Sequence, residues 1–208
     1  MLAQILLAFD YLAVAVFAVT GALTASRKQM DVIGFLWLAI VTGVGGGTVR
    51  DLLLDQPVFW IRSPSYILVA SAAALVVYFT AHIPNSRYKL ILWLDAIGLA
   101  FVTVLGAEKA LAVGAAPVIA VVMGTITASL GGIIRDILGH EPSILLKKEI
   151  YITAALAGAV AYVAALGLGA PVPVAAVVGA ATAFLLRAGA IARGWTLPTY
   201  RARPGREF

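Results

Sequence analysis

The sequence predicts an all-α polytopic membrane protein with seven transmembrane helices, built as two inverted three-helix repeats followed by a seventh helix. Three observations support this prediction: the amount of apolar sequence, its division into stretches of membrane-spanning length, and a motif that occurs twice. Of the 208 residues, 62% are hydrophobic and 12% are charged, and the mean hydropathy is +1.00. A water-soluble domain of this length could not bury so much apolar surface. Lipid is therefore the expected solvent for most of the chain.

An α-helix needs about 20 apolar residues to cross a bilayer, and seven stretches of this chain meet that requirement. We expect spans at residues 4–25, 31–54, 64–82, 89–107, 115–138, 150–168 and 172–190. Short polar or turn-forming segments separate these stretches. Asp31 is placed to cap the start of the second helix. Glu108 and Lys109 follow the fourth span, where we expect a solvated loop.

Lysine and arginine residues gather on one side of the predicted membrane. With the N-terminus outside, the inside segments hold Arg27, Lys28, Arg87, Lys89, Lys147, Lys148, Arg187, Arg193, Arg201, Arg203 and Arg206. The outside loops hold only Arg62 and Lys109. The positive-inside rule therefore predicts an external N-terminus and a cytoplasmic C-terminus in the inner membrane. The net charge of +5 is accounted for by cytoplasmic loops, so no nucleic-acid partner is expected.

A short motif occurs twice at a constant spacing. The stretch 45–54 reads GGGTVRDLLL and the stretch 131–138 reads GGIIRDIL, with 85 positions between Arg50 and Arg135. The same spacing relates Asp10 to Asp95. Each copy contains three spans, an odd number, so the second copy enters the membrane from the opposite side. The resulting divisions are a first repeat 1–82, a second repeat 83–168, a seventh helix 169–190 and a cytoplasmic tail 191–208.

Glycine-rich runs interrupt the second and fifth spans. Glycine costs about 1 kcal/mol relative to alanine within a helix, so these runs favour a kink or a short unwound turn. One explanation is close helix packing through small residues. The other is a permeation or substrate site near mid-depth, which the recurrence at inverted positions favours. The candidate pore residues are Thr42, Gly43, Gly45, Gly46, Gly47, Thr48, Thr127, Ser129, Gly131 and Gly132.

Charged residues lie inside the predicted spans, where a charge near the bilayer centre costs about 2.5–3.5 kcal/mol on insertion scales. We predict two charge clusters, one on each side of the glycine runs. The outer cluster is Asp10, Arg50 and Asp51, and the inner cluster is Asp95, Arg135 and Asp136. Two roles are open for them: acidic pore mouths that attract cations, or salt bridges that only pin helices together.

These features carry a family resemblance. The glycine-broken spans with GGGTVRD and GGIIRD, the two three-span repeats and the seventh helix resemble the trimeric intracellular cation channel (TRIC) family, in its bacterial branch. The resemblance covers residues 5–190. It implies a homotrimer in membrane lipid, with one path for monovalent cations, mainly K⁺ with some Na⁺, inside each subunit. That path is expected between the first, second, fourth and fifth spans, with kinks at Gly45, Gly46, Gly47, Gly131 and Gly132.

One motif of the family is missing. Animal members carry a Lys-Glu-Val motif linked to lipid and voltage control, and Glu108-Lys109-Ala110 does not match it. No phosphoinositide site is therefore carried over to this chain.

Two functions fit the sequence. The first is a potassium-preferring channel with a hydrated pore in each subunit, gated at the kinked second and fifth helices. The second is a secondary transporter of a small solute such as glycine, because inverted repeats with broken helices also build transporters. An enzyme is not expected, since each intramembrane aspartate has an arginine neighbour or an equivalent partner. With no cysteine and only two distant histidines, His82 and His140, no metal site or cofactor is expected.

Overall fold

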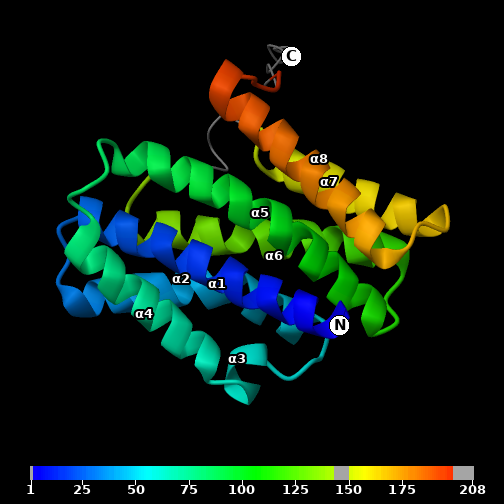
Figure 1. Ribbon diagram of the computed structural model, residues 1–208, viewed down its shortest axis with the longest axis horizontal. Helices are drawn as coiled ribbons and strands as arrows, with labels where there is room; N and C mark the ends of the chain where they lie inside the picture. Colours follow the sequence, from blue (N-terminus) through cyan, green and yellow to red (C-terminus); the bar gives the residue numbers. More distant parts are fainter. Residues whose placement is uncertain (1, 143–149, 199–208) are drawn as a thin grey trace, which may run out of the picture.

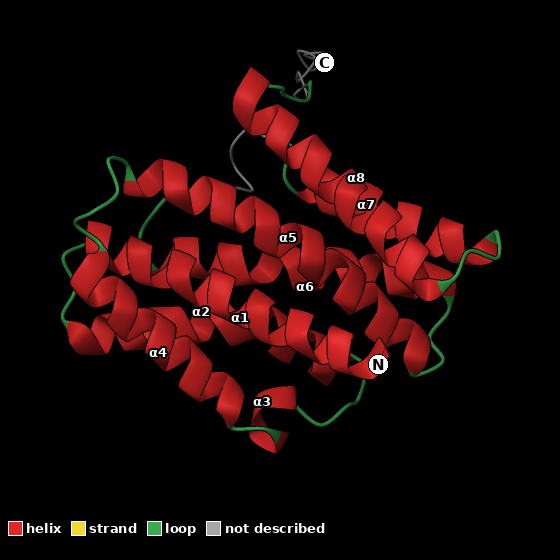
Figure 2. Cartoon of the chain, viewed as in Figure 1, coloured by secondary structure: helices red, strands yellow, loops and turns green. Residues whose placement is uncertain are grey.

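The computed structural model describes residues 2–142 and 150–198, and α-helices account for most of this part of the chain (Figure 2). The helices are α1 (Leu2–Arg27), α2 (Val32–Leu53), α3 (Phe59–Arg62), α4 (Ser65–Thr80), α5 (Arg87–Ala112), α6 (Pro117–Leu138), α7 (Ile152–Gly167) and α8 (Val172–Arg193). Five of them, α1, α2, α5, α6 and α8, are long and apolar enough to cross a membrane. Helices α4 and α7 are apolar but shorter, with 16 residues each. The protein is therefore an all-helical, multi-pass membrane protein.

Four long helices form the centre of the molecule (Figure 1). Helix α1 packs on α2 and α5, and α6 packs on α2 and α5, which closes a ring of four. Helix α4 covers α1 and α2 on one flank, while α7 and α8 cover α5 and α6 on the other. This arrangement buries the α1, α2, α5 and α6 faces that carry the candidate pore residues.

Helix ends follow local sequence signals. Asp31 caps α2 as predicted, because its Oδ1 accepts the backbone N–H of Gly34 at 2.7 Å. Pro117 occupies the first turn of α6, where the missing N–H costs nothing. Gly194 ends α8 in the left-handed conformation, with φ of 67°. Residues 199–208 of the predicted cytoplasmic tail lie outside the described residues.

One expectation about local structure was wrong, and one short helix was not predicted. Helix α5 continues to Ala112, so Glu108 and Lys109 belong to its last turns and not to a solvated loop. Glu108 accepts the Tyr162 hydroxyl of α7, and Lys109 pairs with Asp51 of α2, as described below. The short helix α3 was not predicted, because its four residues are too few to give a periodic pattern.

The glycine runs lie within continuous helices. Both α2 and α6 keep α-helical hydrogen bonding through these runs, so the unwound turn that we considered is absent. The glycines instead allow close contact between α2 and α6. A Cβ on Gly131 would lie 2.8 Å from the carbonyl oxygen of Thr42, and one on Gly46 would overlap the carbonyl oxygen of Thr127. These two contacts are equivalent, since Gly46 and Gly131 are 85 positions apart, and so are Thr42 and Thr127.

Because α2 and α6 touch at Gly46, an alanine should destabilise the protein more at this position than at a glycine that faces open space. We expect Gly46→Ala to lower the free energy of unfolding by about 1–3 kcal/mol, because the added methyl forces α2 away from α6. Gly167→Ala is the matched control, since a Cβ there meets no atom within 4 Å. Thermal unfolding of the detergent-solubilised variants measures the difference. Equal melting temperatures for the two variants would show that α2 and α6 do not approach each other at Gly46.

Candidate functional site

Two cavities lie among the central helices. The first, named here the Asp10 cavity, has a volume of about 30 Å³, enough to hold water. Its walls come from α1, α2, α3, α5 and α6. The lining residues are Asp10, Ala13, Val14, Phe17, Thr42, Gly43, Gly46, Gly47, Arg50, Phe59, Val102, Leu105, Thr127 and Gly131.

The second, named the Glu141 cavity, has a volume of about 20 Å³. Its lining residues are Thr24, Arg27, Tyr88, Ile91, Leu92, Arg135, Asp136, Glu141 and Pro142. At its rim, Glu141 Oε1 pairs with Arg27 at 3.4 Å and with Lys28 at 3.3 Å. These bonds tie the end of α1 to the segment that follows α6.

The two cavities follow one another along the same helices. On α1, the Asp10 cavity ends at Phe17 and the Glu141 cavity begins at Thr24. Seven residues of α-helix span about 10 Å. The same order holds on α6, where Gly131 lines one cavity and Arg135 the other. The cavities are therefore separated by a short barrier within the ring of α1, α2, α5 and α6.

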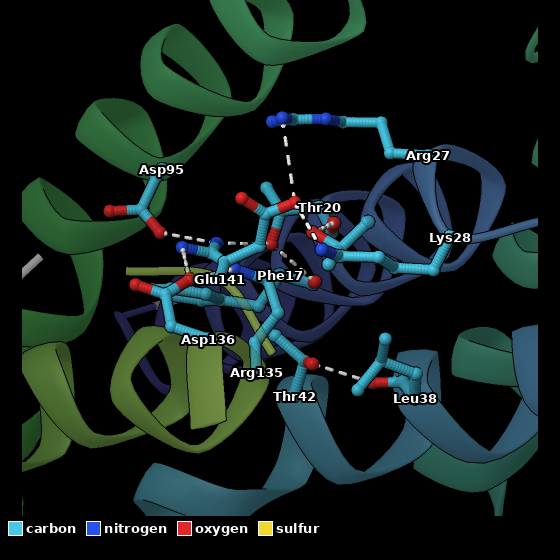
Figure 3. Close-up of polar contacts among 11 residues, drawn as sticks. Phe17, Thr20, Arg27, Lys28, Leu38, Thr42, Asp95, Arg135, Asp136 and Glu141 are labelled. Carbon is cyan, nitrogen blue, oxygen red and sulfur yellow. Dashed lines mark hydrogen bonds and ion pairs between the residues drawn. The ribbon is translucent and has the colours of Figure 1, made fainter. Parts of the chain in front are cut away.

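Phe17, Thr20 and Arg135 lie in this barrier (Figure 3). The Phe17 ring fills the space left by two glycines, because a Cβ on Gly98 would lie 2.8 Å from it and one on Gly131 would lie 3.7 Å from it. Thr20 is fully buried and donates its hydroxyl to the Phe17 carbonyl at 2.8 Å. The barrier thus combines an aromatic ring with a hydroxyl and a guanidinium.

Arg135 connects three helices through its guanidinium, which is shielded from solvent (Figure 3). Its Nη1 donates to Asp95 Oδ1 on α5 at 2.7 Å and to Thr20 Oγ1 on α1 at 3.0 Å. Its Nε and Nη2 donate to Asp136 Oδ1 at 3.0 and 2.9 Å. Asp95 is 0% exposed. The predicted inner cluster of Asp95, Arg135 and Asp136 is therefore a single bonded network with two carboxylates and one guanidinium.

Gly132 leaves room for this network. A Cβ there would lie 2.7 Å from the Tyr151 hydroxyl and 3.2 Å from Asp95 Oδ1. Within the described part of the chain, the Tyr151 hydroxyl and Asp95 Oδ2 are buried without a hydrogen-bond partner. A second buried arginine, Arg187 on α8, lies over the Tyr151 ring and donates to the Ile150 carbonyl at 3.3 Å.

The equivalent residues of the first repeat are arranged differently. Arg50 Nε and Nη2 each lie 2.9 Å from Asp51 Oδ1, matching Arg135 and Asp136. Lys109 adds a second cation at 3.0 Å from the same oxygen, and Asp51 Oδ2 accepts the Phe59 N–H at 2.9 Å. Among the described residues, however, Asp10 forms no ion pair with Arg50. It lines the cavity, and its Oδ2 accepts the Tyr66 hydroxyl at 3.4 Å.

The predicted hydroxyl groups donate back to their own helices. Thr42 and Thr127 donate to the carbonyls of Leu38 and Met123 at 2.5 and 2.6 Å, and both line the Asp10 cavity. Each hydroxyl oxygen lies beside a glycine of a neighbouring helix, since a Cβ on Gly21 would lie 2.7 Å from Thr42 Oγ1 and one on Gly106 would lie 2.8 Å from Thr127 Oγ1.

Four predicted pore residues line neither cavity: Gly45, Thr48, Ser129 and Gly132. Gly45 faces Ile134, Thr48 accepts the Trp60 indole N–H at 2.9 Å, and Ser129 donates to the Thr125 carbonyl. Asp51, Asp95 and Gly132 also lie behind the walls, in contact with the residues that form them.

Several residues of the site were missed. Phe17 and Thr20 correspond to Val102 and Leu105 at the 85-residue spacing, so the repeat gave no signal for them. Tyr66 and Tyr151 do share the spacing and could have been included on that ground. Lys109 was assigned to a loop, although its ammonium neutralises Asp51 and lies 5.8 Å from the centre of the Phe59 ring.

Comparison with known proteins agrees with this geometry. A family model described as "Glycine transporter" matches the chain twice, at residues 7–82 and 92–167, and the two matches are displaced by the same 85 positions. The solved TRIC trimeric intracellular cation channel orthologue from Rhodobacter sphaeroides is 52% identical. Its TM-score is 0.90, over 92% of this chain and 100% of that chain. The chain belongs to the TRIC family.

Two other proteins are also similar to this chain over almost its whole length. A solved structure from work on conductance through TRIC cation channels is 35% identical, with a TM-score of 0.84 over 95% of this chain and 98% of that chain. The UPF0126 inner membrane protein YadS of Escherichia coli K12 is 40% identical over 92% of this chain and 94% of its own length. TRIC proteins are ion channels, so this chain falls in a class that is not enzymatic.

The two repeats predict unequal roles in stability for equivalent aspartates. We expect Asp95→Asn to lower the free energy of unfolding by about 1.5–3 kcal/mol, because it weakens a buried hydrogen bond to a charged group. Asp10→Asn should cost less than about 1 kcal/mol, since Asp10 has only a 3.4 Å hydroxyl contact. Thermal unfolding in detergent compares the two variants. A larger loss for Asp10→Asn would contradict the assignment of the ion pairs.

Proposed function

We propose that the protein is a homotrimeric, potassium-preferring channel for monovalent cations in the inner membrane, with one hydrated pathway inside each subunit. The observation that carries this proposal is the pair of cavities in series along α1, α5 and α6. The similarity to TRIC cation channels over almost the whole chain supports it. In this account the described state is closed, because the cavities are separated by Phe17, Thr20 and Arg135.

The topology of the proposal follows from sequence and helix order. Helices α1, α2, α4, α5, α6, α7 and α8 serve as seven membrane crossings, with the N-terminus outside and the C-terminus in the cytoplasm. The three helices α1, α2 and α4 correspond to α5, α6 and α7 in an inverted orientation. The double match of one family model supports this correspondence. The Asp10 cavity then opens outward and the Glu141 cavity opens inward.

Both cavities carry carboxylates, each balanced by basic groups. The Asp10 carboxylate lines the outer cavity with Arg50, and Asp136 and Glu141 line the inner one with Arg27 and Arg135. In the outer cavity, threonines such as Thr42 and Thr127 offer neutral oxygen ligands that can replace part of an ion's hydration shell. Neutral oxygens compensate dehydration less strongly than carboxylates do. They therefore favour K⁺, which holds its water less tightly than Na⁺.

In this proposal, movement of α2 and α6 at their crossing opens the barrier between the cavities. Gly46 and Gly131 bring the two backbones into contact at the wall of the outer cavity. Bending or separation of the helices at these glycines would widen the pathway without breaking any side-chain bond at the crossing.

A secondary transporter of a small solute such as glycine is the second candidate. The description of the matching family as a glycine transporter favours it. Asp10 and Arg50 line one cavity and present the two charges that a zwitterion needs. Its volume of about 30 Å³ suits water in this state, so a carrier would require a large rearrangement before it could bind solute.

Planar-bilayer recording of the purified protein tests the proposal. Under asymmetric K⁺ and Na⁺ we expect single-channel current steps with a reversal potential displaced toward that of K⁺. Gly46→Val and Gly131→Val should abolish the current or lock one conductance level, because each side chain collides with the facing helix. Gly167→Val is the control outside the pathway.

Two outcomes would contradict this function. Saturable glycine uptake into proteoliposomes, with no current steps, would identify a carrier. Normal currents in folded Gly46→Val and Gly131→Val trimers would remove the helix crossing from the gate.

A further inference from the structure

The guanidinium of Arg135 occupies a cluster of oxygen atoms contributed by three helices. Asp95 Oδ1, Asp136 Oδ1 and Thr20 Oγ1 lie 2.7, 2.9 and 3.0 Å from its nitrogens. Asp95 and Thr20 are 0% exposed. Two carboxylates surround one guanidinium, so these three side chains carry a net charge of −1. The cluster has the composition of a cation site, and its present occupant is part of the protein.

Unpartnered polar atoms beside the guanidinium support this interpretation. In the part of the chain that the structure describes, Asp95 Oδ2 and the Tyr151 hydroxyl are buried with no hydrogen-bond partner. Buried polar atoms without partners are rare and costly. Arg135 therefore leaves some of the coordinating capacity around it unused, which a small mobile ion with its own water could satisfy.

We propose that Asp95, Asp136 and Thr20 form the inner binding site for a permeant monovalent cation, and that Arg135 is a tethered cation which fills this site when the channel is closed. The proposal rests on the proposed function and names an ion site within that pathway. Exchange of the guanidinium for K⁺ leaves the charge of the site unchanged. Arg135 also lines the Glu141 cavity, so its side chain would withdraw toward that cavity, which must widen from about 20 Å³ to take the guanidinium.

In the first repeat, the arginine of the same motif is not paired with the more distant aspartate. Arg50 keeps its bonds to the adjacent Asp51 but forms no ion pair with Asp10, which instead lines a cavity. The adjacent Arg-Asp pair therefore persists when the more distant aspartate does not pair with the arginine. By analogy, Arg135 can give up Asp95 and Thr20 first, while it still holds Asp136, before it withdraws and leaves all three oxygens to the ion.

A binding measurement tests the site without requiring conduction. Arg135→Ala vacates the site, so K⁺ should raise the melting temperature of this variant relative to N-methyl-D-glucamine at equal ionic strength. The wild-type protein should show no comparable difference. Arg50→Ala is the matched control and should also show none, because Lys109 still neutralises Asp51.

Bilayer recording provides the second arm. Arg135→Ala should raise the open probability about tenfold, equivalent to about 1.4 kcal/mol lost from the closed state. Free guanidinium ion in the bath should restore closure in Arg135→Ala but not in Arg50→Ala. Arg135→Gln repeats both arms with better-preserved side-chain volume. Should neither Arg135 variant fold, Thr20→Val decides the matter: it should raise the open probability, whereas Thr103→Val, another buried threonine, should not.

Failure of the proposed ion site and failure of the proposed channel function give different results. A wild-type channel that conducts, with Arg135 variants that respond to neither K⁺ nor guanidinium, would overturn the tethered-cation site and leave the proposed function standing. Absence of conduction in the wild-type protein would instead overturn the proposed function.

Discussion

The central constraint on this fold is one desolvated arginine. Arg135 is enclosed between α1, α5 and α6, and each of those helices supplies an oxygen atom to its guanidinium. A buried charge that loses its partner costs several kcal/mol, so the three helices cannot move independently. The barrier between the two cavities is thus also the contact that holds the second repeat against α1. A structural salt bridge and a functional gate need not be separate features here.

The small residues of the central helices make this enclosure possible. Gly46 and Gly131 let α2 and α6 touch through their backbones, Gly132 leaves space for Tyr151 and Asp95, and Gly98 accommodates Phe17. Each glycine costs helix stability, but in a bilayer the close approach that it permits is a main source of helix association. The helix-packing explanation of the glycine runs and the pathway explanation therefore describe the same residues. Close packing sets where the pathway narrows.

The sequence predicted which charged side chains pair more accurately than it predicted the backbone conformation at the glycine runs. The 85-residue spacing related Asp10, Arg50 and Asp51 to Asp95, Arg135 and Asp136, and depth arguments grouped Arg135 with Asp95, which the structure places 2.7 Å apart. The same reasoning overestimated the effect of three consecutive glycines on α2, because packing against α6 maintains the helix. Phe17 and Thr20 could not be predicted from the repeat, since they have no counterpart in the other copy. Their role depends on how α1 crosses α6. Lys109 was missed because α5 continues beyond the end of its apolar stretch, and the apolar stretch was all that the sequence could delimit.

Accessibility of Thr20 tests most directly whether the two cavities belong to one ion pathway. The chain contains no cysteine, so Thr20→Cys supplies the single thiol in the protein. The measurement is the single-channel current of Thr20→Cys before and after exposure to a small cationic methanethiosulfonate reagent. The account predicts that modification occurs when the channel opens and reduces the current. Modification that leaves the current unchanged would show that ions pass elsewhere and would contradict the account.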